Sequence, residues 1–363
     1  MTARQPGRLR TSTTVEASGG DWRETADFVL EAERLGLDVC WVAEAWGSDA
    51  VSPLGYLAAR TERILLGSAA IQLATRTPVA LAQAAITLSA MSGGRFLLGL
   101  GPSGPQVIEG LHGVPFDRPL TRMRETVEIV RLAASGERID YRGREFTIPR
   151  PGGEGRPMRL SARAEQPIPV YLAALSPRML RLTGEVADGW LGTSFVPEGS
   201  RAAYFDHLDA GLAAAGRKRA ELDVCQGAEV AFAEDEEALS AMVAGRRREL
   251  AFSLGGMGSA RTNFYNAAYS RQGWAEVAAE VRERWQAGDR DGAAALVTDE
   301  MVLATTLIGT ERMVRERLRV WRDAGVDTVR FYPAGDSLAQ RLDTLGRAVE
   351  LAREIDGEID HGG

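Results

Sequence analysis

The chain alternates between two patterns of hydrophobic and polar residues along most of its length. Segments with apolar residues at helical spacing end in Gly or Asp, and short runs that are apolar throughout follow them, as in DWRETADFVLEAERLGLDVCWVAE at residues 21–44. Runs without alternation are typical of parallel strands that are covered on both faces. We predict eight such strands, at residues 10–14, 38–43, 64–70, 95–100, 168–174, 189–193, 222–229 and 327–332.

Eight helix–strand units in 363 residues fit an α/β fold of the (β/α)8 barrel type, with insertions, better than an open sheet. Residues 134–167 interrupt the pattern with two short alternating runs, which predict a hairpin, and a Gly- and Pro-rich loop. Residues 252–306 form a second insertion, long enough to build a lid or an interface. No linker divides the chain, so we predict one barrel domain over residues 1–363.

Composition and charge exclude several classes of function. The net charge is -7, and no long Lys/Arg run is present, so general nucleic-acid binding is not expected. No run of about 18 apolar residues predicts a membrane span. The N-terminal residues 1–20 lack the apolar core of a secretory signal, so we expect a cytoplasmic protein.

The two cysteines and three histidines carry no metal or disulfide pattern. Cys40 and Cys225 each lie in a short apolar stretch, which predicts buried thiols in strands. Neither paired cysteine spacings nor a dense His/Cys cluster occurs, so no metal site is expected.

The sequence RFLLGLGPSG contains Gly99, Gly101 and Gly104 in the order G-x-G-x-x-G. A dinucleotide fingerprint of this form needs a strand before it and a helix that starts inside it. Pro102 and Pro105 favour a loop here, and the strand is the fourth of the series rather than the first. We therefore interpret these glycines as a loop at the carboxyl end of a barrel strand, where backbone can approach a planar ligand closely.

Small and polar residues follow the other predicted strands in the same way. In a barrel the carboxyl ends of all strands meet at one mouth, where active sites lie. The residues that we expect to converge there include Glu44, Trp46, Gln72, Arg76, Ser176, Thr193 and Ser194.

Several stretches resemble the luciferase-like monooxygenase superfamily, and within it the coenzyme F420-dependent oxidoreductases related to methylenetetrahydromethanopterin reductase. The resemblance runs from about residue 10 to 335 and rests on AERLGLDVCWVAEAWGSDAVSPLGYLAARTERILLG, IQLATRTP, LSAMSGGRFLLGLGPSGPQVIEG, VYLAALSPRMLRLTGEVADGW, GGMGSARTNFYN and GTERMVRERLRVWRDAGVDTV. It implies a (β/α)8 barrel of the bacterial-luciferase type that holds a deazaflavin at its mouth. It is less specific for the cofactor, because flavin-using relatives share the fold.

The resemblance also implies a cofactor site. The ring would face a bulge at Ser68-Ala69-Ala70 with a non-prolyl cis peptide at Ala69-Ala70, although these small residues also suit an ordinary strand. Glu44 would lie near the ring, unless it is a surface carboxylate, and Gln72 would bind the ring edge. Arg178 would meet a phosphate or belong to a solvated helix face. The further contacts implied are Gly101, Ser103, Gly104, Ala174, Leu175, Gly184, Glu185, Gly192 and Thr193.

The chain departs from the sugar-phosphate dehydrogenases of this family. These carry a His after the acidic residue and a Glu after the glycines, where this chain has Ala45 and Pro102-Ser103. Hydride transfer with few acid–base groups suits reduction of an activated C=C or C=N bond. The remaining acid–base candidates are Glu44, Glu109 and His112, although a lone His is more often structural.

The stretch GGMGSARTNFYN in the second insertion is implied to reach toward the cofactor or the substrate. Trp46, Phe264 and Tyr265 are then candidates for the wall of the substrate cavity, and Arg261 for contact with an anionic tail. The alternative for this stretch is a helix N-terminal turn with its own packing.

Three functions follow as hypotheses. The first is an F420-dependent oxidoreductase that acts on a small molecule. The second is an FMN-dependent two-component monooxygenase of the same fold, and the third is a non-catalytic cofactor-binding barrel subunit. The apolar segment PVALAQAAITLSAM, together with FVLEAERL, suits a subunit interface, so a homodimer is expected.

Overall fold

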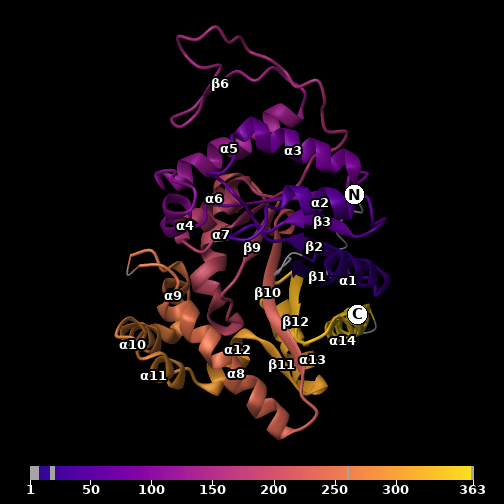
Figure 1. The fold of residues 1–363 in the computed structure, drawn as a ribbon, viewed down its shortest axis with the longest axis vertical. Helices are drawn as coiled ribbons and strands as arrows, with labels where there is room; N and C mark the ends of the chain where they lie inside the picture. The colour runs from indigo at the N-terminus through magenta and orange to yellow at the C-terminus, as the bar shows by residue number, and fades with distance from the viewer. Residues whose placement is uncertain (1–7, 17–20, 260, 361–363) are drawn as a thin grey trace.

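Eight parallel strands close into a barrel in the computed structural model, which describes residues 8–16, 21–259 and 261–360 (Figure 1). The order around the barrel is β1-β2-β3-β5-β8-β9-β10-β12, and β12 pairs with β1 to close it. The strands are β1 (Arg10–Val15), β2 (Val39–Val42), β3 (Leu65–Ser68), β5 (Phe96–Gly101), β8 (Val170–Ala173), β9 (Gly189–Gly192), β10 (Asp223–Phe232) and β12 (Thr328–Pro333).

Each of the eight predicted strands overlaps a barrel strand, so the predicted α/β barrel is confirmed. Two strands differ in extent. The predicted strand 64–70 ends at Ser68, and the short strand β4 (Ile71–Gln72) follows it and pairs with β5. Strand β10 continues to Phe232, where β11 (Leu307–Gly309) pairs with it outside the barrel.

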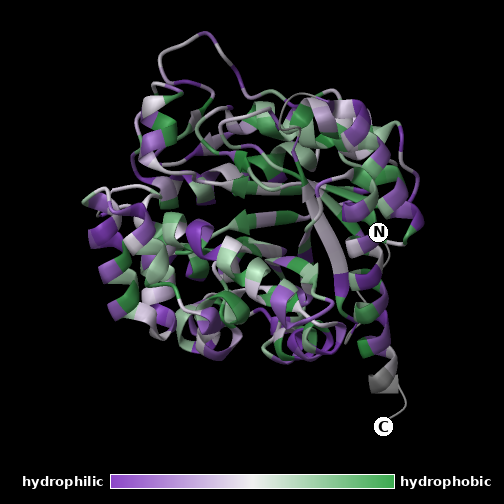
Figure 2. Cartoon of the chain, turned by 60° about the horizontal axis from the view of Figure 1, so that its bottom comes forward, coloured by the Kyte–Doolittle hydropathy of each residue, from purple (hydrophilic) through white to green (hydrophobic). Residues whose placement is uncertain are grey.

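Helices surround the barrel and cover the outer faces of its strands (Figure 1). Hydrophobic residues dominate the central strands, and hydrophilic residues gather on the outer helices (Figure 2). Side-chain caps begin several of the helices, with Asp21, Thr77, Ser176 and Thr310 each accepting a backbone N–H of the first turn. The helices are α1 (Trp22–Arg34), α2 (Val51–Ala58), α3 (Pro78–Met91), α5 (Pro119–Ala134), α6 (Pro177–Val186), α7 (Asp206–Ala214), α13 (Glu311–Asp323) and α14 (Leu338–Asp360).

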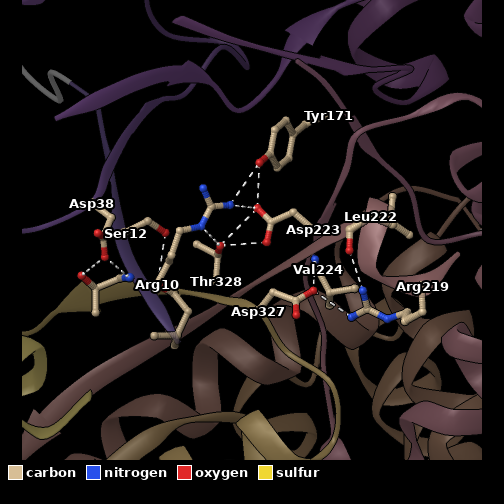
Figure 3. Close-up of polar contacts among 12 residues, drawn as sticks. Arg10, Ser12, Asp38, Tyr171, Arg219, Leu222, Asp223, Val224, Asp327 and Thr328 are labelled. Atoms are coloured by element: carbon tan, nitrogen blue, oxygen red, sulfur yellow. Dashed lines mark hydrogen bonds and ion pairs between the residues drawn. The ribbon is translucent and has the colours of Figure 1, made fainter. Parts of the chain in front are cut away.

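A buried polar network fills the bottom of the barrel, at the amino ends of the strands (Figure 3). Arg10 forms an ion pair with Asp223 and donates hydrogen bonds to the Tyr171 hydroxyl (3.3 Å) and to Thr328 Oγ1 (3.1 Å). The Tyr171 hydroxyl donates in turn to Asp223 Oδ2 (2.7 Å). This network joins β1, β8, β10 and β12 at the end opposite the mouth, so we assign it a structural role.

Two insertions leave the barrel, as the sequence predicts. The predicted hairpin is confirmed: β6 (Tyr141–Arg142) and β7 (Thr147–Ile148) pair antiparallel. The second insertion begins at Glu236, earlier than the predicted residue 252, and its helices share an apolar cluster of their own, around Leu254 and Val302. Its helices are α8 (Glu236–Gly255), α9 (Phe264–Tyr269), α10 (Ala275–Gln286), α11 (Arg290–Ala295) and α12 (Asp299–Thr305).

Other expectations from composition can be compared with the described residues. Cys40 on β2 and Cys225 on β10 are buried, as predicted. Within the described ranges no helix is long and apolar enough to cross a membrane, and no group of His, Cys, Asp and Glu could hold a metal ion. Much of the segment 1–20, on which the expectation about a secretory signal rests, lies outside the described residues.

Candidate active site

Small residues from neighbouring strands meet at the mouth of the barrel. A Cβ placed on Gly101, at the end of β5, would lie 3.3 Å from the Ala70 Cβ and 3.4 Å from the Ala173 Cβ. Ala69 belongs to the same interior cluster, and the peptide bond between Ala69 and Ala70 is cis, as the resemblance implies. We call Ala69, Ala70, Gly101 and Ala173 the small-residue shelf. Its lack of bulky side chains suits a planar ring system.

The glycine motif has a structural explanation within the barrel. A Cβ on Gly99 would overlap the Ser68 carbonyl, while the Ser68 hydroxyl bridges the Gly99 N–H and C=O at 2.9 Å each. The predicted loop is present at residues 102–104 but ends there, because the six-residue helix α4 (Pro105–Gly110) begins directly after Gly104. The proline that suggested a loop occupies the first helical turn, where proline is favoured. Because the preceding strand belongs to a closed barrel, the motif is not a Rossmann fingerprint.

Glu44 connects three segments below the rim of the mouth. Its carboxylate accepts the N–H groups of Ala50 (2.9 Å) and Gln72 (3.2 Å) and pairs with Arg76 Nη1 (2.7 Å). The side chain is 7% exposed, which contradicts the alternative of a surface carboxylate. With its oxygens engaged in this way, Glu44 is better suited to positioning the loops after β2 and β3 than to moving a proton.

Replacement of Glu44 by alanine is expected to destabilise the fold by about 1.5–3 kcal/mol, because hydrogen bonds to a charged group are lost and Arg76 is left without this partner. Urea unfolding measures the effect. The control is Asp49→Ala, which removes a longer and more exposed contact to Arg76 (4.0 Å) together with the hydrogen bond from the Ser52 N–H (2.8 Å), and is expected to cost about 1 kcal/mol. Unchanged stability with loss of hydride transfer would instead assign Glu44 to the chemistry.

Gln72 presents an unsatisfied buried acceptor beside the shelf. Its side chain is 2% exposed, and Nε2 donates to the Ala45 carbonyl. Its Oε1 atom is buried without a hydrogen-bond partner among the described residues. An unpaired buried acceptor is costly, and a ligand N–H at this position would satisfy it.

Two serines hold strained backbone at the ends of barrel strands. Ser103, after β5, has φ +59°, and Ser194, after β9, has φ +55°. Positive φ is uncommon for residues other than glycine and tends to cluster at ligand sites. The strain at Ser103 lies in the segment that the resemblance assigns to the cofactor.

The remaining acid–base and substrate candidates occupy different environments. Glu109 and His112 are exposed around the end of α4, and Glu109 accepts the Phe116 N–H (3.2 Å). Trp46 is 66% exposed, and Phe264 is half-buried at the start of α9. The structure therefore does not bring Glu109, His112 or Trp46 into a buried site.

Gly184 and Glu185 lie far from the mouth, because α6 begins there and runs away from it. Gly184 is about 10 Å along the helix from Pro177 at 1.5 Å per residue. A Cβ on Gly184 would overlap backbone of α7, so this glycine permits close helix packing. Glu185 pairs with Arg124 and with Arg181 (3.4 Å), and Arg178 is exposed.

Arg271 is a candidate that the sequence did not reveal. It lies in the π-helical turn η4 (Ser270–Trp274), and its Nη2 donates to the Leu175 carbonyl (2.6 Å), one residue before the Ser176 cap of α6. Its Nε is buried without a partner, and burial lowers its pKa. A cation beside a helix N-terminus is suited to a phosphate. No motif marks SRQGW, so only the fold could identify it.

Tyr265 and Thr193 also lie at the mouth, on the side of β9, β10 and β12. Tyr265 is close enough to Arg330 and Tyr332 for electrostatic interaction, and burial raises its pKa. The predicted loop reaches the rim, where Gln106 Nε2 donates to Thr262 Oγ1 (3.0 Å), while Arg261 is exposed. A cavity of about 680 Å3 adjoins this side and is lined by Thr13, Thr14, Val15, Glu16, Asp21, Glu24, Thr25, Phe28, Thr193, Glu229, Arg246, Tyr332, Pro333, Ala334 and Arg341.

Known proteins match this chain over most of its length. A model of the luciferase-like monooxygenase family matches residues 2–328. A Mycobacterium tuberculosis protein, provisionally named a coenzyme F420-dependent oxidoreductase, is 39% identical over 322 residues, covering 86% of this chain and 91% of the relative. A 5,10-methylenetetrahydromethanopterin reductase of Archaeoglobus fulgidus is 30% identical over 324 residues, covering 89% and 93%.

A solved structure shares the barrel fold. The coenzyme F420-dependent tetrahydromethanopterin reductase of Methanopyrus kandleri superposes with a TM-score of 0.79 at 24% identity. The superposition covers 94% of this chain and 99% of the other. At this identity the likeness supports the fold alone.

Proposed function

This chain belongs to the luciferase-like monooxygenase family and is an enzyme, and on that premise we propose that it is an F420-dependent oxidoreductase. Hydride would pass between the deazaflavin C5 and a small organic substrate. The relatives named above support the cofactor, since one is named for coenzyme F420 and matches 86% of this chain.

The small-residue shelf is the observation that carries the proposal. Ala70, Gly101 and Ala173 leave room for a planar ring, and the free Gln72 Oε1 offers an acceptor for a ring N–H. The N-terminus of α6 and Arg271 would hold the phosphate of the tail. The bound deazaflavin supplies a hydride, and the residues of the chain bind the ring, orient it and keep water from its face.

The reaction that suits this mouth is reduction of an activated C=C or C=N bond. The dedicated base position holds Ala45, and Glu44 is engaged by Arg76 and two backbone N–H groups. Glu109 and His112 are exposed. Such a site favours a reaction in which orientation of donor and acceptor does most of the work.

An activity assay tests the proposed function. Enzyme and reduced F420 are mixed with electron-poor alkenes and imines, with and without oxygen, and the absorbance of oxidised F420 is followed. Substrate-dependent oxidation of F420 that needs no oxygen supports the proposal. Oxygen uptake with reduced FMN would assign a monooxygenase, and binding without turnover a non-catalytic subunit.

Replacement of Arg271 by alanine is expected to weaken F420 binding about 10- to 100-fold, the range of 1.5–3 kcal/mol for a charged hydrogen bond. Binding of the ribityl deazaflavin that lacks the phosphate should not change. Fluorescence titration measures both ligands. Arg178→Ala is the matched control, because that exposed arginine has the same charge near the same helix. A larger effect of Arg178→Ala than of Arg271→Ala would contradict the assignment.

We propose a homodimer as the assembly. Half of the residues of the apolar helix α3 are buried within the chain, among them Leu81, Ala85 and Leu88. Met91 at its end and Tyr56 on α2 remain exposed, as a subunit interface requires. Sedimentation analysis distinguishes a dimer from a monomer.

A further inference from the structure

Arg330 places a buried cation in the barrel interior, near the mouth. It lies on β12, where it pairs in register with Gly227 of β10, and the residue is 6% exposed. Its Nη2 donates to the Gly192 carbonyl (3.0 Å) at the end of β9. A Cβ on Gly227 would lie 3.0 Å from Arg330 Nε and 2.8 Å from Tyr332 Cε2, so the glycine leaves room for both side chains.

The guanidinium is not neutralised by a carboxylate among the described residues. Its Nε is buried without a hydrogen-bond partner, and its other neighbours are the Tyr332 ring (5.6 Å to the centroid), Tyr265 and Cys225. Burial acts to lower its pKa, but Tyr332 and Cys225 outweigh it and the pKa is raised, so the cation persists. A buried charge without a counter-ion is costly to the fold, which is typical of residues kept for a ligand.

Arg330 and the small-residue shelf lie on opposite sides of the barrel. In the closed order of eight strands, β12 lies halfway round from β5, which carries Gly101. A substrate between them would have one side against the deazaflavin ring and a polar group at the guanidinium. Tyr265 and Tyr332 flank that position, and burial raises the pKa of the Tyr265 hydroxyl.

The charged side chains that line the adjoining cavity indicate which polar group of the substrate binds at the Arg330 guanidinium. Its lining carries four carboxylates, Glu16, Asp21, Glu24 and Glu229, against two guanidinium groups, Arg246 and Arg341. Glu229 and Arg246 neutralise each other at 2.8 Å, and Glu24 and Arg341 do so at 2.8 Å. The lining therefore holds two more carboxylates than guanidinium groups, and this excess of acidic residues disfavours a substrate that arrives as an anion. A neutral substrate that becomes anionic only at Arg330 avoids this repulsion.

We propose that Arg330, flanked by Tyr265 and Tyr332, binds the carbonyl oxygen of an α,β-unsaturated carbonyl substrate and stabilises the enolate formed from it. This rests on the proposed function. The β-carbon accepts hydride from reduced F420, which is oxidised, and the C=C electron pair moves to give the enolate oxygen. A solvent proton then adds to the α-carbon. Fixed donors at a developing oxyanion lower the barrier most when water is excluded. The site therefore selects conjugated carbonyl compounds over imines.

A phenol of intermediate acidity tests the oxyanion site, because its ionised form resembles a planar enolate. The fluorine NMR shift of 3,4,5-trifluorophenol reports its ionisation when bound. In the wild-type enzyme, with and without oxidised F420, we expect the pKa of the bound phenol to fall by about 1–2 units, as for an acid beside a cation. Arg330→Met should abolish this shift, and Arg330→Lys should restore part of it.

Thermal unfolding of the same variants separates binding from structure. Removing an uncompensated buried charge should leave the unfolding temperature of Arg330→Met equal to or above that of the wild type. An unshifted phenol pKa in the wild type, or a shift that Arg330→Met retains, overturns the proposal. Displacement of the phenol by F420 also overturns it, since the oxyanion would then belong to the coenzyme. Failure of F420 to bind would leave the phenol result standing and refute only the proposed cofactor.

Discussion

Replacement of Asp223 by alanine is expected to lower the free energy of unfolding by about 3–5 kcal/mol, the cost of breaking a buried ion pair on one side. The carboxylate accepts hydrogen bonds from Tyr171 (2.7 Å) and Thr328 (2.9 Å) and pairs with Arg10. Its loss leaves the Arg10 cation in the barrel floor without this partner (Figure 3). Urea unfolding measures the change, and the slope of the unfolding free energy against urea concentration should be the same in the variant and the wild type.

Two further variants make the Asp223 result specific. Asp291→Ala removes an ion pair with Arg248 (2.8 Å) at a carboxylate that is 84% exposed, and should cost less than about 1 kcal/mol. The double variant Arg10→Met/Asp223→Leu removes both charges and should recover much of the stability. If Asp223→Ala and Asp291→Ala lowered the free energy of unfolding equally, the buried polar network at the bottom of the barrel would not have the structural role assigned to it.

Replacement of Gly101 by leucine is expected to weaken F420 binding at least about 100-fold, equivalent to about 2.7 kcal/mol. The new side chain has to pass Ala70 and Ala173, whose Cβ atoms lie within 3.4 Å of its own Cβ position, and it would cover the small-residue shelf. Overpacking of this kind destabilises folds by about 1–3 kcal/mol, so the protein should remain folded. Equilibrium titration of coenzyme fluorescence measures the loss.

The matched control is Gly245→Leu. Gly245 lies in α8, and a Cβ there would meet no atom within 4 Å. This variant adds the same side chain away from the mouth and should bind F420 as the wild type does. Unchanged affinity in Gly101→Leu would mean that the ring does not lie on the shelf.

The hydrophobic pattern predicts the barrel well because a strand that is buried on both faces appears in the sequence as an uninterrupted apolar run. It does not predict which side chains face inward. Ala173 belongs to the shelf but is not among the contacts that the resemblance implies, which include its neighbour Ala174. Successive residues of a strand face opposite sides, so the hydrophobic pattern does not decide between two such neighbours. Gly101 follows a predicted strand that ends at the mouth, whereas Ala70 lies inside the predicted strand 64–70 and was singled out only by the resemblance.

Other site residues depend on contacts that a linear sequence does not display. Gly184 and Glu185 follow the predicted phosphate-binding turn along the chain, but helix α6 carries them away from it. Arg271 reaches the Leu175 carbonyl from 96 residues away. Arg330 did leave a signal, since an arginine inside the apolar strand TVRFYP is unusual, but only the barrel shows what it faces.

Titration of the purified enzyme with F420 and, separately, with FMN tests the central claim most directly. Cofactor fluorescence gives both dissociation constants, and Gly101→Leu shows whether the shelf is the site. We predict micromolar or tighter binding of F420, FMN binding at least about 10-fold weaker (about 1.4 kcal/mol), and loss of F420 binding in the variant. Tighter binding of FMN than of F420 would contradict the account and place the enzyme among the oxygen-using flavin enzymes.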